Sequence, residues 1–417
     1  MNILFLSRWY PYPCDNGAKL RVYNLIRALA VNHSVDLISF ADEPIEGERL
    51  KAMQELCRRV GTARYQSFQP RRVSALLALF SPTPRAFVDT YRQEIAELVI
   101  SFCRKAAYDV VIASELDMAR YALLTKGPVR VLEEIQVGEY VEALRHAEST
   151  FSGVRRRLTW WKLAGYLRRL MNEFDAATVV SSLERAHLAR AGIPVERVQI
   201  VPNGVDMRKV RPSVQPQPDT LIYSGSLTYS ANLDAVVFFL REIFPQIRAH
   251  QPRVTLTVTG RLDGVDLAKL PNLPGVIFTG HLADVAPAIA GSWLSVVPLR
   301  QGGGTRLKVL ESLSLGTPVV STPKGVEGLD LIPNEDVLVA EDPSQFAAAV
   351  IRVLKDSRLR SKLSQAGKQQ VARLYDWEKI GDDFCRFLEV LVAGRNDALR
   401  PDFSKTEKVY RHVIDPS

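Results

Sequence analysis

The sequence predicts an α/β protein with two domains, each built on a parallel sheet. Its 417 residues exceed the size at which a single hydrophobic core keeps growing. Short apolar runs alternate with longer amphipathic stretches, which is the rhythm of βαβ units. This rhythm starts again after a proline-rich linker that reaches Pro218. We therefore expect two sheets, one on each side of the linker.

The first half predicts strands and helices in alternation. In the stretch expected to form the first helix, Val22, Leu25, Ile26 and Leu29 repeat at the spacing of one helical face. That face should pack on the sheet. A long helical stretch is expected after the fourth strand. The predicted strands are 2–6, 35–40, 109–113, 129–132, 177–182 and 198–201, and the first two helices lie near 17–31 and 46–60.

The second half repeats the pattern. Strands are expected at 220–225, 254–259, 276–279, 294–297 and 318–321, with a last helix near 377–393. We expect a first domain over 1–203 and a second over 204–376, followed by a helix over 377–395 and a polar tail over 396–417.

Composition excludes several classes of protein. Hydrophobic residues make up 47% and charged residues 24%, which is typical of a globular protein. The start of the chain lacks a basic region before its short apolar run, and Val73–Phe80 is too short to span a membrane. We expect a protein that is made and kept in the cytoplasm. The cysteines at 14, 57, 103 and 385 show no paired spacing, so reduced thiols and no metal site are expected.

The most informative segment is a glycine-rich turn between a strand and a helix. The strand 294–297 is followed by Gly302-Gly303-Gly304 and by a helix predicted from about Thr305, which could cap it. Glycines let a ligand approach the backbone closely, and the first N–H groups of a helix have no partners within it. The segment is therefore typical of an anion site.

Three charged residues follow this turn. Arg306 and Lys308 add positive charge, and Glu311 lies on the same rising face, where it could accept the two hydroxyls of a ribose. A flexible turn with a surface ion pair is the alternative, which these charges disfavour. The segment is neither the Walker pattern nor the dinucleotide G-x-G-x-x-G pattern.

The run from Gly302 to Thr322, GGGTRLKVLESLSLGTPVVST, resembles glycosyltransferase family 4. Val201-Pro202-Asn203-Gly204-Val205-Asp206, the N-terminal Tyr10–Arg21 and Gly225-Ser226-Leu227 also fit it. The similarity extends to about residue 393 and is greatest to members associated with bacterial exopolysaccharide synthesis. It implies GT-B architecture: two Rossmann-like domains facing a central cleft, with the last helix crossing back to the first domain.

The resemblance also implies roles for individual residues. Glu311 would bind the ribose of the donor, and the amides of 303–307 would bind its sugar and diphosphate. Gly17 would approach the phosphate from the opposite wall, and Gly225 and Ser226 would lie beside the phosphates. The donor-binding set is thus Gly17, Gly225, Ser226, Gly303, Gly304, Thr305, Arg306, Leu307, Lys308 and Glu311.

The sequence departs from the family pattern at three places. Gly303 replaces the first of two glutamates eight positions apart, and 226–232 lacks the usual Arg and Lys. We expect Arg306 and Lys308 to supply that positive charge in catalysis. Ile135 stands where relatives often have His, so Glu134 or Gln136 could take over its contact. A solvated acidic strand end is an equally supported interpretation.

The predicted function is transfer of a hexose from a nucleoside-diphosphate sugar, UDP- or GDP-linked, to a glycan or lipid-linked acceptor in cell-surface polysaccharide assembly. The family implies retention of configuration, and no D-x-D triplet occurs, so we expect neither a metal nor another cofactor. Two alternatives stay open. One is a degenerate sugar-nucleotide-binding partner protein, which the three departures would suit; the other is a nucleotide-sugar 2-epimerase, which Ile135 and Gly303 disfavour.

The formal net charge of +8 predicts attraction to an anionic partner. The basic and aromatic stretch 155–170 could lie on the inner face of a membrane. An amphipathic helix that packs its Trp and Leu residues inside the domain is the favoured alternative. No motif for binding nucleic acid accompanies the charge.

Overall fold

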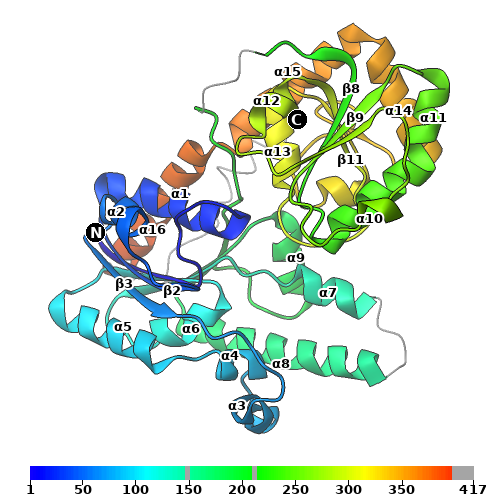
Figure 1. Cartoon of the computed structure of the whole chain (residues 1–417). Helices are drawn as coiled ribbons and strands as arrows, with labels where there is room; N and C mark the ends of the chain where they lie inside the picture. Colours follow the sequence, from blue (N-terminus) through cyan, green and yellow to red (C-terminus); the bar gives the residue numbers. More distant parts are fainter. Residues whose placement is uncertain (146–150, 209–213, 397–417) are drawn as a thin grey trace. The chain divides into compact units, whose positions relative to one another are not determined.

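The computed structural model describes residues 1–145, 151–208 and 214–396 (Figure 1). The chain divides into two compact units. Met1–Pro202 and residues 380–396 form the first, and Asn203–Lys379 forms the second. Among the described residues, no helix combines the length and the apolar content needed to cross a bilayer.

A seven-stranded parallel sheet forms the first unit, in the order β3-β2-β1-β4-β5-β6-β7. The central strands are buried along most of their length, as expected of a parallel sheet covered on both faces. The strands are β1 (Asn2–Ser7), β2 (Ser34–Ala41), β3 (Arg59–Arg64), β4 (Val110–Ser114), β5 (Val129–Glu133), β6 (Ala176–Val179) and β7 (Val198–Ile200).

Helices cover both faces of this sheet, with α1 and α16 on one face and α5 and α6 on the other (Figure 1). The predicted face of α1 is confirmed, since Val22, Leu25, Ile26 and Leu29 are all buried. The helices are α1 (Gly17–Asn32), α2 (Gly47–Gln54), α3 (Val73–Leu77), the 3-10 turn η1 (Ala78–Phe80), α4 (Arg85–Asp89), α5 (Gln93–Lys105), α6 (Leu116–Ala122), α7 (Gly138–Arg145), α8 (Phe151–Glu173), α9 (Ser182–Arg190) and α16 (Trp377–Asn396).

Two boundaries predicted in this unit are wrong. The helix expected over 46–60 ends at Gln54, because residues 59–64 pair with β2 as the edge strand β3. Buried Asp36 on β2 accepts hydrogen bonds from Arg58 and Arg59, which ties the start of that strand to its neighbour. The strand expected to reach residue 182 ends at Val179, since Ser181 caps α9 instead.

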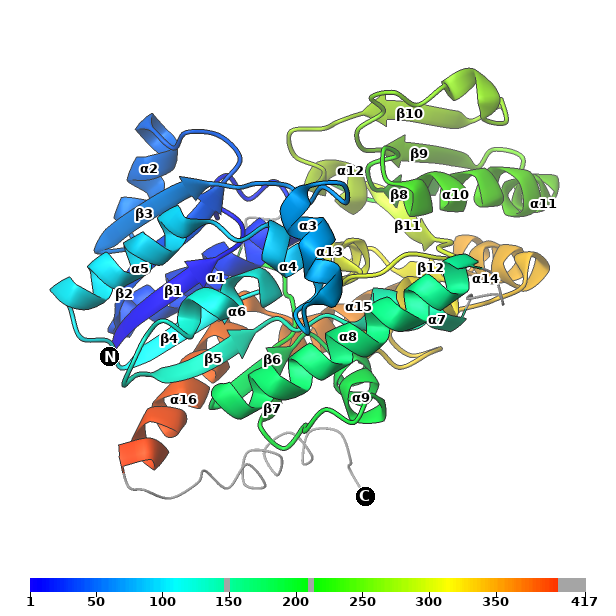
Figure 2. The ribbon, with the colours of Figure 1, turned by 90° about the horizontal axis from the view of Figure 1, so that it is seen from below.

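The second unit contains a six-stranded parallel sheet in the order β10-β9-β8-β11-β12-β13. Figure 2 shows β10, β9, β8, β11 and β12 one after another in this order. The short edge strand β13 was not predicted. The strands are β8 (Gln217–Ser224), β9 (Thr255–Thr259), β10 (Val276–Gly280), β11 (Ser292–Val297), β12 (Val319–Ser321) and β13 (Leu338–Val339).

Helices pack around this second sheet and share one apolar core with it. With two parallel-sheet units, the predicted α/β class is confirmed. The helices are α10 (Ser230–Phe238), the π-helical turn η2 (Phe239–Ile243), α11 (Phe244–His250), the 3-10 turn η3 (Leu267–Lys269), α12 (Ala286–Ala290), α13 (Leu307–Ser314), the 3-10 turn η4 (Pro323–Val326), α14 (Pro343–Lys355) and α15 (Ser357–Leu374).

Candidate functional site

Two loops meet at the carboxyl edge of the second sheet, where the strand order reverses between β8 and β11. Ligands of open α/β sheets bind outside the strand ends at such a reversal. Gly225 follows β8, and a Cβ atom added to it would lie only 2.5 Å from the Lys308 amine. Gly302 follows β11, and a Cβ atom added to it would lie only 2.9 Å from the Tyr229 hydroxyl. These close approaches show that the two glycine segments singled out from the sequence lie together.

The guanidinium of Arg306 holds the glycine loop (302–304) from inside. Its Nη1 and Nη2 donate to the carbonyls of all three glycines over 2.6–2.9 Å, and its Nε donates to the Lys324 carbonyl over 3.0 Å. Only 5% of Arg306 is exposed. We expected this residue to offer its charge directly to an anion. Its planar set of donors is instead directed at the loop backbone.

This arrangement orients the backbone of the loop. In a trans peptide the carbonyl and the N–H point in opposite directions. Because the carbonyls of 302–304 face the guanidinium, the N–H groups of Gly303, Gly304 and Thr305 face away from it. They lie just before α13, whose N-terminal end carries a partial positive charge. The loop can therefore bind an anion through backbone donors.

The helix after the loop begins later than predicted. Its first residue is Leu307, which packs against the core of the unit, and the capping position is Arg306 rather than Thr305. The hydroxyl of Thr305 instead accepts a hydrogen bond from Nδ2 of Asn203 over 2.8 Å. Asn203 is buried and belongs to the Pro-Asn-Gly turn of the family pattern. Thr305 therefore joins that turn to the glycine loop.

Lys308 connects α13 to the loop after β8. Its amine donates to the Tyr223 hydroxyl over 2.9 Å and to Oδ1 of Asn232 over 2.8 Å. Burial lowers the pKa of Lys308 to about 7, although the charge of Glu311 opposes this shift. Tyr223 and Asn232 were missed in the sequence. A tyrosine just before Gly225 and an asparagine in the first turn of the next helix were the available signals.

Two further predicted donor-binding residues are Ser226, which precedes Lys308 in the sequence, and Glu311, which follows it. Glu311 follows Lys308 by three residues on α13 and is partly buried, close enough for its charge to raise the pKa of the amine. The Ser226 carbonyl accepts a hydrogen bond from Nδ2 of Asn232 over 2.8 Å. The structure thus brings the donor-binding residues predicted in this unit together around the loops that follow β8 and β11.

Two family models match the sequence. One is described as Glycosyltransferase Family 4 and matches residues 15–209, and the other as Glycosyl transferases group 1 and matches 218–356. The chain belongs to the family 4 glycosyltransferases. The predicted family and the predicted enzyme class are both confirmed.

Curated relatives of this glycosyltransferase are distant. An uncharacterized 44.6 kDa protein in the cps region of Klebsiella pneumoniae is 21% identical over 91% of this chain and 97% of its own. A GDP-mannose-dependent alpha-(1-6)-phosphatidylinositol monomannoside mannosyltransferase of Mycobacterium tuberculosis is 27% identical over 53% of this chain and 63% of its own. The match therefore spans less than two thirds of that mannosyltransferase.

Solved structures with similar folds are glycosyltransferases of GT-B architecture. Sucrose-phosphate synthase from Thermosynechococcus elongatus has a TM-score of 0.68 at 17% identity, covering 94% of this chain and all of that one. Anabaena Alr3699/HepE, in complex with UDP and glucose, has a TM-score of 0.66 at 16% identity, covering 93% of this chain and 99% of that one. At these identities the likeness establishes the fold.

In the first unit of the glycosyltransferase, β5 ends at two buried carboxylates. Glu133 accepts hydrogen bonds from Nε of Arg21 over 2.6 Å and from the Ser114 hydroxyl over 2.7 Å. Glu134, with a φ of +61° and 5% exposure, accepts a hydrogen bond from Nε2 of Gln136 over 2.6 Å. The alternative of a solvated acidic strand end is wrong, since both glutamates are buried.

Two further predicted positions of the glycosyltransferase lie in this unit. Ile135, which stands where relatives often have His, is fully buried in the apolar core. Gly17 is the first residue of α1, and the Asn16 side chain before it caps the helix by accepting from the Lys19 N–H over 3.0 Å.

Glu115 was missed in the sequence. It follows β4 at the reversal of the first sheet between β1 and β4, with a φ of +69°. Its carboxylate accepts a hydrogen bond from the Trp9 indole over 2.6 Å. Burial, with repulsion from Glu134 and Asp117, raises the pKa of Glu115 to about 8. Polar residues directly after two predicted strands were the only signal for this position.

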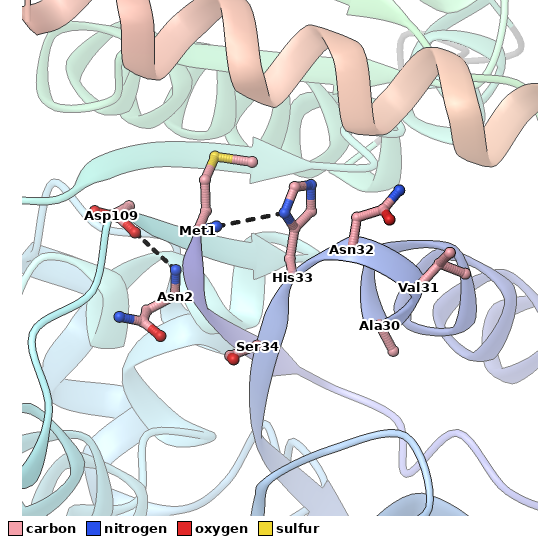
Figure 3. Close-up of a pocket in the computed structure, with 8 residues that line it drawn as sticks. All are labelled: Met1, Asn2, Ala30, Val31, Asn32, His33, Ser34 and Asp109. Atoms are coloured by element: carbon pink, nitrogen blue, oxygen red, sulfur yellow. Dashed lines mark hydrogen bonds between the residues drawn. The ribbon is translucent and has the colours of Figure 1, made fainter.

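A hollow of about 600 Å³ lies at the opposite edge of the first sheet (Figure 3). The amine of Met1 lies 3.4 Å from Nδ1 of His33, and the Asn2 N–H donates to Asp109 over 2.7 Å. These residues precede or begin β1, β2 and β4, so the hollow lies away from the strand ends at which ligands of such sheets bind. Across the described residues, no cluster of three metal-ligating side chains occurs.

Proposed function

We propose that this glycosyltransferase transfers a hexose, with retention and without a metal ion, from a nucleoside-diphosphate sugar to a glycan or lipid-linked acceptor of cell-surface polysaccharide assembly. The observation that carries the proposal is the glycine loop held by Arg306. Its amides turn away from the guanidinium and stand before α13, with the Lys308 amine beside the neighbouring loop. This is a site for a diphosphate.

The donor residues then have distinct tasks. The N–H groups of 303–305 and the Lys308 amine stabilise the diphosphate, and Glu311 accepts the hydroxyls of the ribose. Gly225 lets the amine lie against the backbone, since any side chain there would displace it. Arg306 is a positioning residue, because its donors are used by the loop carbonyls.

The comparisons support the donor and acceptor classes. The mannosyltransferase named above uses GDP-mannose and a phosphatidylinositol-linked acceptor, and Alr3699/HepE binds UDP and glucose. We infer a UDP- or GDP-sugar as donor. The relative from a cps region supports a role in surface polysaccharide synthesis.

The chemistry needs little from acidic or basic side chains. The acceptor oxygen bonds to the anomeric carbon as the bond to the phosphate oxygen breaks, and the hydroxyl proton passes to that departing oxygen. The developing charge on the diphosphate is stabilised by Lys308 and the loop amides. We assign Glu134 and Gln136, which are hydrogen-bonded to each other, to orienting the acceptor or the sugar.

A turnover assay tests the proposal. The protein is incubated with UDP-glucose or GDP-mannose, EDTA and a lipid and glycan extract, and the anomeric signals are followed by NMR. We expect release of UDP or GDP and a product with the donor's anomeric configuration. Epimerised donor would establish the 2-epimerase, and tight binding without turnover would establish a binding partner protein. Either result would contradict the proposal.

A further inference from the structure

An apolar ridge stands out on the surface of the first unit, formed by α3, η1 and the outer face of α8. Both views place α3 beside α8 (Figures 1 and 2), and residues of η1 and α8 line one shared hollow of about 590 Å³. Phe80 is 93% exposed, which is extreme for a phenylalanine. The ridge consists of Val73, Leu76, Leu77, Leu79 and Phe80, with Val154, Leu158 and Trp161 on α8, all 45–93% exposed.

The outer face of α8 is regular. Val154, Leu158 and Trp161 repeat at i, i+4 and i+7 and therefore share one side of the helix. The later part of α8 buries Leu163 and Leu167 in the core. The favoured alternative from the sequence thus holds for Trp160 and for the leucines from Leu163 onward, but not for Leu158 and Trp161, which are 51% and 67% exposed.

Hydrogen bonds hold the backbone beneath the ridge in place, so the exposed apolar side chains stand on a fixed backbone. Buried Asp89 accepts hydrogen bonds from Arg72 over 2.8 Å and from the Gln69 N–H over 2.9 Å at the start of α3. Lys162 donates to the Leu79 carbonyl, and so α8 anchors η1 directly. An apolar surface held rigidly in water favours a partner that covers it.

The charge around the ridge identifies that partner. The sequence carries no acidic side chain within 66–88 or 151–172, the two segments that form the ridge. The same segments carry the basic side chains Arg71, Arg72, Arg85, Arg155, Arg156, Arg157, Lys162, Arg168 and Arg169. Exposed apolar groups ringed by cations match a bilayer with anionic headgroups, where the apolar groups enter the interface and the cations bind phosphates.

We propose that the ridge docks this protein onto the surface of an anionic phospholipid bilayer. Leu77 and Phe80 insert below the headgroups, and Arg155 and Arg157, which are exposed on α8, bind them. The ridge shares no residue with the donor site of the second unit. It supplies the means by which a lipid-linked acceptor, included in the proposed function, would be reached.

The apolar part is tested by flotation of the full chain with vesicles of phosphatidylcholine, with and without phosphatidylglycerol. We expect binding to the anionic vesicles, and a drop of roughly tenfold or more in the partition coefficient of Leu77→Ser/Phe80→Ser. Val31→Ser/Val390→Ser is the matched control, since both valines are exposed in the same unit outside the ridge. The control should stay within about twofold of the wild type.

The cationic part is tested in the same assay. Arg155→Gln/Arg157→Gln should lose about fivefold in partition for each charge, and added salt should weaken the wild type in the same way. Arg241→Gln/Arg253→Gln, two exposed arginines of the second unit, removes equal charge outside the ridge and should bind as the wild type does.

Two outcomes would overturn the proposal. One is a wild-type protein that ignores anionic vesicles, and the other is a control pair that loses as much binding as the ridge pair. Sedimentation velocity tests for a third. If the wild type formed a dimer that Leu77→Ser/Phe80→Ser dissociated, and did not bind vesicles, the ridge would be covered by a second copy of the chain instead of a bilayer. UDP and GDP affinities of every variant are measured alongside and should not change, so failure of the donor site is seen separately.

Discussion

The side chain of Arg306 holds the backbone of the glycine loop in its conformation. A lysine at this position keeps the charge but has one ammonium in place of a planar fork, so it cannot hold three carbonyls at once. We expect Arg306→Lys to lower the free energy of unfolding by about 2–4 kcal/mol and to weaken nucleotide binding. Urea unfolding and calorimetry measure both quantities.

Arg300→Lys is the matched control for that substitution. Arg300 precedes the same loop and pairs with Asp234, but its side chain is half exposed, so the change should cost less than about 1 kcal/mol. If Arg306→Lys kept wild-type stability and affinity, the role of Arg306 would be that of a charge facing the ligand.

Lys308 makes nucleotide binding depend on pH. With its pKa lowered to about 7, the amine of the free protein is mostly neutral at pH 8, whereas a bound diphosphate favours the charged form. Binding at pH 8 should therefore take up nearly one proton, and this uptake should vanish below about pH 6. Calorimetry in buffers of different ionisation enthalpy measures it, and Lys308→Met should abolish it.

The same shift has a consequence for stability. The folded pKa lies below the unfolded value of 10.5, so the unfolded chain binds more protons between about pH 7 and 10.5. The contribution of Lys308 to the free energy of unfolding should rise with pH across this window, so the free energy of unfolding of the wild type minus that of Lys308→Met should rise as well. A difference that stays constant with pH would contradict the burial of the amine.

Substitution of Glu311 tests whether this carboxylate binds the ribose of the donor. Removing a charged acceptor of two hydroxyl groups should weaken nucleotide affinity by about 1–3 kcal/mol in Glu311→Ala. Glu341→Ala, an exposed glutamate of the same unit, should leave the affinity unchanged. Equal affinities in two folded variants would place the ribose elsewhere.

How far the site could be predicted depends on whether a contact is local. Gly303, Gly304, Lys308 and Glu311 lie within one segment, so the spacing along the chain was enough to group them. The bond between Asn203 and Thr305 joins positions 102 residues apart, and that between Trp9 and Glu115 joins positions 106 apart. Sequence spacing carries no information about such pairs.

At the scale of elements, the carboxyl ends of β8 and β9 depend on each other. A Cβ on Gly260 would lie 2.3 Å from the Gly225 carbonyl, and Gly260 has a φ of +136°. Gly260→Ala should therefore displace Gly225 and reduce nucleotide affinity although residue 260 lies outside the glycine motif. We expect it to cost at least about 2 kcal/mol of stability more than its control.

That control is Gly264→Ala. Gly264 also has a left-handed φ, +73°, but a Cβ there would meet nothing within 4 Å. Its replacement should cost about 1 kcal/mol for backbone strain alone. If both alanine variants behaved alike, the close approach of Gly260 to Gly225 would have no part in shaping the site.

The elements that were predicted correctly are those with a strong apolar pattern. β1, β4 and α1 agree with the prediction within one or two residues because each buries an apolar run or face. The edge strands β3 and β13 were not predicted. Arg59–Arg64 carries two arginines and a glycine, and Leu338–Val339 has only two residues, so neither has the alternation that indicates a strand.

At the scale of the whole molecule, both sheets reverse their strand order at the point where polar residues gather. In the second sheet the reversal at β8 and β11 gives the glycine loops, and in the first the reversal at β1 and β4 gives Trp9 and Glu115. Chain length and the repeated βα rhythm were enough to predict two sheets. They could not predict the burial of Glu115, which depends on strands that are distant in the sequence.

Calorimetric titration of the protein with UDP, GDP, ADP and TDP in the presence of EDTA will decide whether the glycine loop is the donor site. We expect saturable, selective binding of UDP or GDP at one site per chain, weakened by Lys308→Met and by Glu311→Ala. If the folded protein bound none of the four, or bound one equally well after both substitutions, the glycine loop would not be the donor site.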